Sequence, residues 1–263
     1  MLLNNIMNKL EIKRMKDKGE RHYSDKGDLF NLPMKLLVIG RSQLSGKTNF
    51  ICSILLDDDP RLYGDDFDGE NIYLFSPSAT TDHKLKVLIH NKEIPKSNIF
   101  KNMNEDIIEA LYENIQEEYL EHDSEGKKAP NVLFIFDDMS FGKNIHNSAI
   151  EKLFCNGRHL NISTIVSAQK YTQLPSVARE NATGMVLFNS TDKQLELMSD
   201  DNNYFENRKD FKSLFRKLTK EKHQFLVVNY SNSFDKLYMN NNFEPVGKCG
   251  KPKGNGCDCP EDH

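Results

Sequence analysis

Short continuous runs of apolar residues recur along this chain, and each is bounded by polar, glycine or proline positions. Runs of this length and composition predict buried β-strands. They fall at residues 35–40, 71–78, 131–140, 163–169, 183–190 and 223–232. A further segment, "FDKLYMNN" (234–241), is predicted to pair with the last run.

Between these runs lie segments whose apolar residues fall on one side of a helix. The predicted helices are 47–58, 104–121, 148–160 and 204–222. In the second, Asn104 is a suitable N-cap and acidic residues occupy the first turn. Strands that alternate with helices predict an α/β fold with a mostly parallel sheet, here over residues 31–243.

The two ends of the chain differ from this pattern. Residues 1–30 are polar and positively biased, which predicts a solvated arm, with contact to nucleic acid or a neighbouring subunit as the alternative. Residues 244–263 are rich in Gly, Pro and Lys, which predicts a flexible tail. Four potential zinc ligands occur there but lack paired C-x2-C spacing. They are Cys249, Cys257, Cys259 and His263.

Composition narrows the class of protein. The formal net charge of −4 argues against a protein that coats nucleic acid, although a local basic surface stays compatible with it. No apolar run approaches the ~20 residues of a membrane-spanning helix, and we see no signal peptide. Isolated cysteines such as Cys52 and Cys155 suit a reducing compartment, so we expect a cytoplasmic location.

The stretch "LVIGRSQLSGKTNF" (37–50) resembles a phosphate-binding loop with one residue too many. The usual spacing is Gly, four residues, then Gly-Lys-Thr or Gly-Lys-Ser, whereas Gly40 is followed by five residues before Gly46. We expect Ser45 to Thr48 to keep normal geometry and the surplus residue to be absorbed among Arg41 to Leu44. The predicted nucleotide-binding residues are Gly40, Ser45, Gly46, Lys47, Thr48 and Asn49. The alternative is a chance Gly-Lys-Thr in a strand-turn-helix.

The chemistry of such a loop is simple. Small residues let several backbone N–H groups point at one anion, and the following helix directs the positive end of its dipole there. Lys47 would reach the β- and γ-phosphates, and the Thr48 hydroxyl would ligate Mg²⁺. ATP and Mg²⁺ are therefore the predicted cofactors.

A second motif, "VLFIFDD" (132–138), is an apolar strand that ends in adjacent carboxylates. In phosphoryl-transfer sites an Asp at this position holds magnesium, usually through water, which we assign to Asp137. A neighbouring carboxylate can activate the attacking water, which we assign to Asp138. The alternative is a strand end in which the acids only cap a turn.

Three further side chains are candidates for catalysis. Gln169 ends the strand 163–169 and would lie at the γ-phosphate if that strand pairs with 132–137. Arg158 and Arg179 flank the same segment, and either could act as an arginine finger toward a neighbouring subunit's ATP. The alternatives are a glutamine bonded to a loop and arginines in surface salt bridges.

The ordered set of motifs resembles the poxvirus-type genome-packaging ATPases of large DNA viruses and virophages, within the FtsK–HerA group of P-loop motors. The resemblance covers residues 33–240 and rests on "LVIGRSQLSGKTNF", "IYLFSPS", "VLFIFDDM", "GRHLNISTIVSAQKYTQLP", "ARENATGMVLF" and "FLVVNYSN". It implies a RecA-like core with ATP and Mg²⁺. It also implies a homo-oligomeric ring, with six subunits expected, that pumps double-stranded DNA into a capsid. The resemblance further implies capsid or portal proteins as partners. It implies a location at assembly sites in the host cytoplasm, with association to the virion.

Residue by residue, the resemblance places phosphate and magnesium roles on Lys47 and Thr48 and matches Asp137 and Asp138 to the acidic pair. Gln169 matches the residue after the next core strand, and Arg158 falls where this group often has its trans-acting arginine. The loop's extra residue is a departure from the pattern. The aspartate at 138 is another, because many relatives in the wider superfamily carry Glu there.

The sequence offers several candidates for a DNA-contacting surface, and it is compatible with two functions other than a motor. A basic stripe on the helix 204–222 could face DNA or solvent, and loop lysines Lys143 and Lys170 are equal candidates. The stripe consists of Lys209, Lys212, Arg216 and Lys220. The alternatives to a motor are a P-loop kinase for a small molecule and a nucleotide-binding assembly module without turnover.

Overall fold

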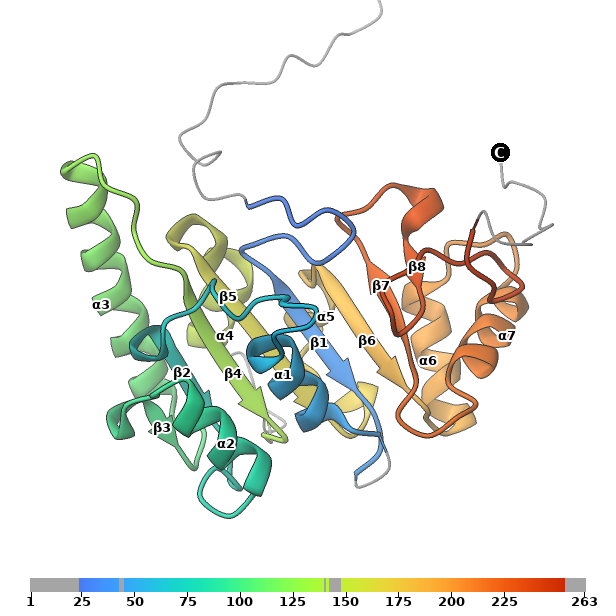
Figure 1. Ribbon diagram of the computed structural model, residues 1–263, viewed down its shortest axis with the longest axis horizontal. Coiled ribbons are helices and arrows are strands. Elements are labelled where there is room, and N and C mark those ends of the chain that lie inside the picture. The colour runs from blue at the N-terminus through green and yellow to red at the C-terminus, as the bar shows by residue number, and fades with distance from the viewer. Residues whose placement is uncertain (1–23, 43–44, 140, 142–147, 254–263) are drawn as a thin grey trace, which may run out of the picture.

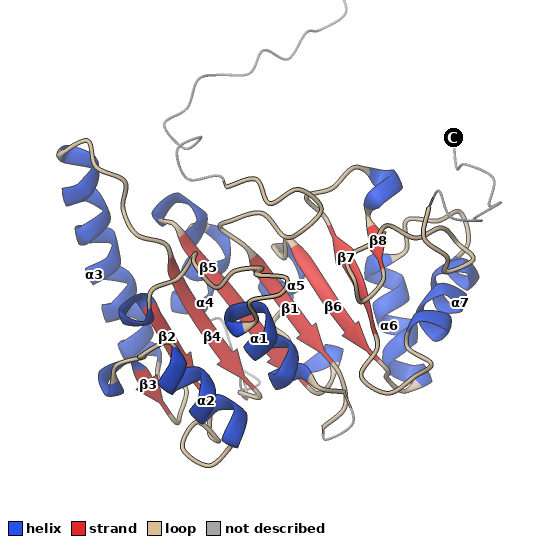
Figure 2. Ribbon diagram, in the orientation of Figure 1, coloured by secondary structure: helices blue, strands red, loops and turns tan. Residues whose placement is uncertain are grey.

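An eight-stranded sheet forms the centre of the computed structural model, which describes residues 24–253 except 43–44, 140 and 142–147 (Figure 2). The strands are β1 (Lys35–Ile39), β2 (Ile72–Phe75), β3 (Ile99–Phe100), β4 (Val132–Asp137), β5 (Ile162–Ala168), β6 (Gly184–Phe188), β7 (Phe225–Asn229) and β8 (Tyr238–Met239). Their order is β3-β2-β4-β5-β1-β6-β7-β8. Strands β1 to β6 pair in parallel, whereas β7 pairs antiparallel with β6 and β8 pairs antiparallel with β7. This arrangement confirms the predicted mostly parallel α/β fold. The outermost strands, β3 and β8, have two residues each.

Helices cover both faces of the sheet. They are α1 (Lys47–Leu56), α2 (His83–Asn91), α3 (Glu105–Ser124), α4 (Ser148–Cys155), α5 (Ser176–Glu180), α6 (Asp192–Asn202) and α7 (Arg208–Leu218). Helices α1 and α2 lie in front of the sheet in Figure 1, with α4 and α5 behind it. Because side chains alternate along a strand, Leu36 and Val38 of β1 pack on the α1 face, while Leu37 and Ile39 pack on the other.

The carboxyl ends of the central strands form one edge of the sheet. Strand β5 lies between β1 and β4, with Ile39 opposite Ala168 and Asp137 opposite Ser167. Strands β5 and β4 are therefore neighbours, which is the condition under which Gln169 would lie at a γ-phosphate. In open α/β sheets, ligands bind beyond the carboxyl ends of the strands, so this edge is where a site is expected.

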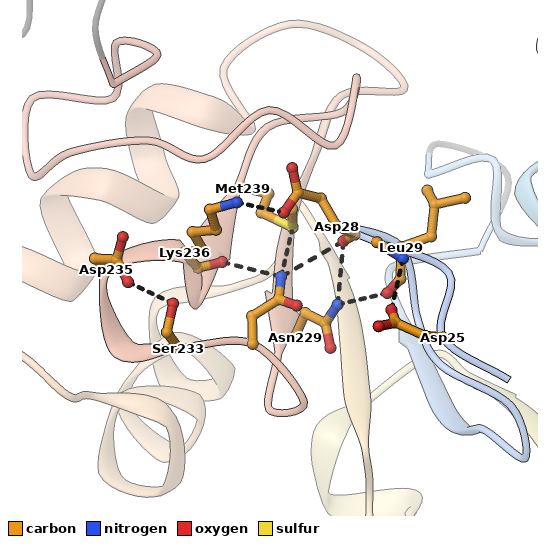
Figure 3. Close-up of polar contacts among 10 residues, drawn as sticks. Asp25, Asp28, Leu29, Asn229, Ser233, Asp235, Lys236 and Met239 are labelled. Carbon is orange, nitrogen blue, oxygen red and sulfur yellow. Dashed lines mark hydrogen bonds and ion pairs between the residues drawn. The ribbon is translucent and has the colours of Figure 1, made fainter. Parts of the chain in front are cut away.

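Residues 24–30, which the sequence analysis assigned to the arm, contact the domain where described. Asn229 Nδ2 donates to the carbonyls of Asp28 (3.2 Å) and Leu29 (3.0 Å), and Lys236 forms an ion pair with Asp28 at 2.9 Å (Figure 3). Phe30 is 1% exposed and its carbonyl accepts a hydrogen bond from the Tyr63 hydroxyl. Residues 24–30 therefore pack against the end of β7 and against the face of the sheet that α1 covers.

The start of the predicted tail also contacts the domain. Val246 is buried in the core on the α3–α7 face, and short bridges join Met239 to Pro245 and Val246 to Pro252. Among the described helices, none combines the length and the apolar character that a bilayer crossing requires.

Candidate nucleotide-binding site

The loop between β1 and α1 ends at Gly46. This residue caps α1 in the left-handed conformation, with φ +93°, which glycine adopts without strain. Just before it, Ser45 is buried and its Oγ donates to the Arg41 carbonyl at 2.7 Å. Two of the residues expected to absorb the loop's extra length, at positions 43 and 44, lie outside the described residues.

Lys47 is buried inside this loop. Its Nζ donates to the Gly40 carbonyl at 3.0 Å and lies 3.4 Å from Asp138 Oδ1. That second contact is an ion pair without hydrogen-bond geometry, because Asp138 Oδ1 has no hydrogen-bond partner among the described residues. The lysine thus joins the loop to the acidic pair at the end of β4.

The two acids at the end of β4 have different surroundings. Asp137 is 2% exposed, and its Oδ1 accepts from Ser167 Oγ at 2.7 Å and from Thr48 Oγ1 at 3.4 Å. Burial raises the pKa of Asp137, and the hydrogen bond from Ser167 acts against that rise. Asp138 follows at φ +50°, and its N–H donates to Ser167 Oγ at 3.0 Å. This left-handed conformation, which Asp tolerates, turns the second carboxylate toward Lys47.

The donors at this point suit magnesium. Mg²⁺ prefers hard oxygen ligands and is usually held by one or two carboxylates together with substrate phosphates. Thr48 Oγ1 and Asp137 Oδ1 already lie 3.4 Å from each other, at the N-terminus of α1. The buried, unbonded oxygen of Asp138 provides a further acceptor nearby. These residues therefore fit the ion that their motif predicts.

Gln169 lies at the same edge. It follows Ala168, whose carbonyl accepts a hydrogen bond from the Gly40 N–H at 3.1 Å, and its side chain is exposed. The end of β5 is thereby fixed between the loop and the acids. Asn49, on the first turn of α1, is also exposed. The structure brings together, at this edge, Gly40, Ser45, Gly46, Lys47, Thr48, Asn49, Asp137, Asp138 and Gln169.

The two arginines lie elsewhere. Arg158 is in the turn Gly157–Leu160 that precedes β5, at the opposite edge of the sheet, where it is exposed and donates to His159 Nε2 at 3.3 Å. Arg179 pairs with Asp201 at 2.8 Å, and its guanidinium lies 5.1 Å from the Tyr171 ring centroid. Within one chain, the described contacts connect neither arginine to the acidic pair.

Some of the basic side chains that are candidates for DNA contact form ion pairs within the chain. On α7, Lys212 pairs with Glu196, and Arg216 pairs with Asp192 at 2.9 Å. Lys170 is exposed after β5, and Lys143 lies outside the described residues. Of the four potential zinc ligands, only Cys249 lies among the described residues.

Two site residues were missed by sequence reasoning. Ser167 stands opposite Asp137 in the β4–β5 register, and the only signal was a polar residue near the end of an apolar strand. His223 precedes β7, yet its Nδ1 lies 3.4 Å from the Ser45 carbonyl. Nothing in the sequence near His223 indicates this contact with Ser45.

The chain is similar in sequence to curated DNA packaging proteins of poxviruses. It is 29% identical over 189 residues to DNA packaging protein OPG160 of Monkeypox virus and to that of Vaccinia virus (strain Copenhagen). The match covers 68% of this chain but only 55% and 61% of those proteins. The chain thus spans less than two thirds of the length of these relatives.

Solved structures share the fold. The genome packaging NTPase B204 from Sulfolobus turreted icosahedral virus 2, in complex with AMP, superposes with a TM-score of 0.53 at 16% identity. That match covers 79% of this chain and 96% of B204. The complex of B204 with AMPPCP gives a TM-score of 0.50, again at 16% identity, over 76% of this chain and 93% of B204.

The sequence model described as Poxvirus A32 protein matches residues 20–242. This range contains the predicted phosphate-binding loop, the acidic pair and Gln169, which are among the features on which the resemblance to poxvirus-type packaging ATPases rests. The chain belongs to the Poxvirus A32 protein family.

Proposed function

We propose that this chain is an ATP-hydrolysing motor that translocates double-stranded DNA into a viral capsid. The observation that carries the proposal is the convergence of Lys47 and Thr48 with Asp137 and Asp138 at one sheet edge, in a chain of this family. Its relatives carry the name DNA packaging protein, and its fold is shared with a packaging NTPase.

The proposed chemistry begins with phosphate binding. Backbone N–H groups around Gly46 and the N-terminus of α1 bind the phosphates, and Lys47 exchanges its Gly40 and Asp138 contacts for phosphate oxygens. Thr48 and Asp137 would hold Mg²⁺, which when bound neutralises charge on the phosphate oxygens.

Hydrolysis then requires an oriented water. We assign its positioning to Gln169 and its deprotonation to Asp138, which accepts the proton as the water oxygen attacks the γ-phosphorus. The bond from the γ-phosphorus to its bridging oxygen breaks, and ADP and phosphate are the products. Asp138 is released for this role when Lys47 moves onto the phosphates.

We also propose an oligomeric ring, with six subunits expected, and the position of Arg158 supports it. This arginine is at the sheet edge opposite the acidic pair, so only a neighbouring subunit could bring it to a γ-phosphate. We assign the trans-acting role to Arg158 and leave Arg179, which pairs with Asp201, as the second candidate. DNA would pass through the ring, and capsid or portal proteins would anchor it at assembly sites in the host cytoplasm.

Phosphate release by the purified, assembled chain tests the proposal. ATP hydrolysis should require Mg²⁺ and should rise on addition of double-stranded DNA, with a stimulation that falls steeply with salt. Lys47→Ala should abolish nucleotide binding, whereas Asp138→Asn should abolish hydrolysis and retain binding. Hydrolysis that is unchanged in both variants would contradict the site assignment.

Other outcomes separate the remaining functions. ATP hydrolysis that DNA does not stimulate at any salt concentration would leave an ATPase without the motor. Tight ATP binding without phosphate release, with or without DNA, would identify an assembly module. A phosphorylated small-molecule product would identify a kinase.

A further inference from the structure

A cavity of about 530 Å³ adjoins the phosphate-binding loop on the α1 face of the sheet. It reaches from Ser45, Gly46 and Asn49 to the turn that follows β8. Its volume falls within the roughly 300–1,000 Å³ of small-molecule sites. Ser45, Gly46 and Asn49 are predicted nucleotide-binding residues, but no role has been assigned to the rest of the cavity.

The apolar walls of the cavity are aromatic and held in place. Phe50 of α1 and Phe188 at the end of β6 both pack against Phe225, with ring centroids 5.2 Å and 5.1 Å apart. The fourth ring, Phe243, packs edge-on against Phe30 at 5.7 Å. Aromatic rings fixed in this way provide flat, rigid apolar surface for another planar ring.

The turn that carries Phe243 is built around one side chain. Asn240 Oδ1 accepts from the N–H of Asn242 at 2.9 Å and of Glu244 at 3.0 Å. Phe243 has φ +59°, a conformation that bulky residues rarely adopt. Such a residue persists where its surroundings fix it, and residues of this kind cluster at ligand clamps. The turn thus holds Asn241, Asn242 and Phe243 at the cavity.

The polar groups of the cavity have unused hydrogen-bonding capacity. In the part of the chain that the structure describes, the side chains of Asn49, Asn241 and Asn242 make no hydrogen bond. A carboxamide offers a donor and an acceptor side by side, which matches N6 and N7 of adenine. Near the loop, a Cβ on Gly46 would lie 3.1 Å from His223 Nδ1, so the imidazole lines the cavity close to Gly46.

We propose that this cavity binds the adenine and ribose of the nucleotide whose phosphates lie on the loop. Phe243 packs against the base, Asn241 and Asn242 bind its hydrogen-bonding edge, and Asn49 and His223 lie beside the ribose. The inference rests on the proposed function, because it requires a nucleotide at the loop. It adds that the turn after β8 determines which base is accepted.

Competition binding with ATP, GTP and inorganic triphosphate on the full chain tests this. The double variant Asn241→Ala/Asn242→Ala removes exposed, unbonded side chains, so folding is unaffected. Its affinity for ATP should fall about 10-fold or more and its preference for ATP over GTP should narrow, because lost base contacts of ~1.4 kcal/mol correspond to 10-fold. Affinity for inorganic triphosphate should stay unchanged.

Phe243→Ala provides a second variant, with the same loss expected for ATP and none for inorganic triphosphate. The matched control is Asn91→Ala/Asn102→Ala, which removes two exposed asparagines at the far end of the sheet and should leave all three affinities unchanged. The base pocket alone would be overturned if both cavity variants bound ATP as tightly as the wild type does. It would also be overturned if the wild type bound ATP and inorganic triphosphate with equal affinity. A wild-type chain that binds neither compound would instead overturn the proposed function.

Discussion

Ser167 Oγ donates a hydrogen bond to Asp137 Oδ1 over 2.7 Å and accepts one from the Asp138 N–H over 3.0 Å. A single hydroxyl on β5 therefore fixes the side chain of one acid and the backbone of the next. Ser167 is fully buried, so water cannot replace it without a rearrangement. We infer that it is a positioning residue for both acids.

Ser167→Ala should lower ATP hydrolysis by roughly 10- to 100-fold, the usual effect of losing a group that orients metal ligands. The Mg²⁺ concentration needed for half-maximal rate should rise, because Asp137 would be free to rotate. ATP affinity in the absence of Mg²⁺ should change little. A Mg²⁺ titration of the steady-state rate measures the first two effects.

A matched control comes from the same strand. Thr164 is buried and its hydroxyl has no hydrogen-bond partner among the described residues, so Thr164→Val should leave the Mg²⁺ requirement unchanged. Ser167→Thr, which keeps a hydroxyl, should recover part of the activity. An unchanged Mg²⁺ requirement in Ser167→Ala would show that the bond only supports the fold.

The two arginines should behave differently when they are replaced. Arg158→Ala should reduce hydrolysis by the assembled protein by roughly 10³-fold or more, the effect of losing an arginine finger. Its stability should change by less than about 0.5 kcal/mol, because the side chain is exposed. Arg179→Ala should instead destabilise the chain by about 0.5–1 kcal/mol through its lost contacts with Asp201 and Tyr171. Thermal melts and phosphate release distinguish the two.

Mixing experiments test whether the arginine acts between subunits. Arg158→Ala and Lys47→Ala chains should each be inactive alone. Mixed rings should recover activity, because an interface can then combine an intact Lys47 with an intact Arg158 from the next chain. Recovery with Arg179→Ala in place of Arg158→Ala would reassign the trans-acting role to Arg179.

Gly40→Ala should disturb the phosphate-binding loop. A Cβ on Gly40 would lie 2.6 Å from Ser45 Cβ and from Phe188 Cβ, so the loop or β6 must shift. We expect a lower Tm and weaker binding of inorganic triphosphate, measured by calorimetry. Gly184→Ala is the control, because its Cβ would clash with Phe30 at the opposite edge and should lower Tm alone. Equal triphosphate affinity in wild type and Gly40→Ala would show that the loop absorbs the methyl group.

Lys35 provides a test of pH dependence away from the site. Burial lowers the pKa of Lys35 from 10.5, and Arg158 lowers it further. The folded chain therefore binds this proton less tightly than the unfolded chain, and the charged lysine costs stability at neutral pH. Lys35→Met should raise Tm at pH 7 by about 2–4 °C, even though the Phe154 carbonyl loses its donor.

The difference in Tm between Lys35→Met and the wild type should shrink as pH rises through the lowered pKa of Lys35 toward 10.5. In this range the wild type loses the positive charge on Lys35. Melting curves from pH 7 to about pH 10 follow this change. Exposed Lys86 offers a control, and Lys86→Met should show no such convergence. A gain in Tm for Lys35→Met that stays constant with pH would attribute it to packing instead.

Much of the fold could be predicted because its central strands are buried on both faces and read as continuous apolar runs. The predicted pairing of 234–241 with the preceding strand is confirmed by β7 and β8. Helices α2 and α6 were missed. In α2 only Leu85 and Leu88 are buried hydrophobic residues, and α6 buries several polar side chains, so neither shows a clear apolar face in sequence.

The acidic loop 57–70 has mostly exposed charges, yet it also carries aromatic residues of the core, which its composition does not reveal. Tyr63 is 0% exposed and Phe67 is 1% exposed, and both belong to the core on the α1 face. For the site, the motif residues are grouped because each follows a strand of the same sheet. Ser167 and His223 reach the site through contacts across strands and between distant loops, which a linear pattern does not encode.

The two-residue strands at the borders of the sheet bear on how copies of the chain meet. A long, flat border strand presents a row of unpaired N–H and C=O groups that can recruit another chain's backbone. Strands β3 and β8 present few such groups. In the proposed ring, short border strands would favour contacts between subunits through side chains of helices and loops, which could loosen and reform during each ATP cycle. They would also disfavour fusion of neighbouring sheets into one continuous β-structure, which would lock a ring in a single state.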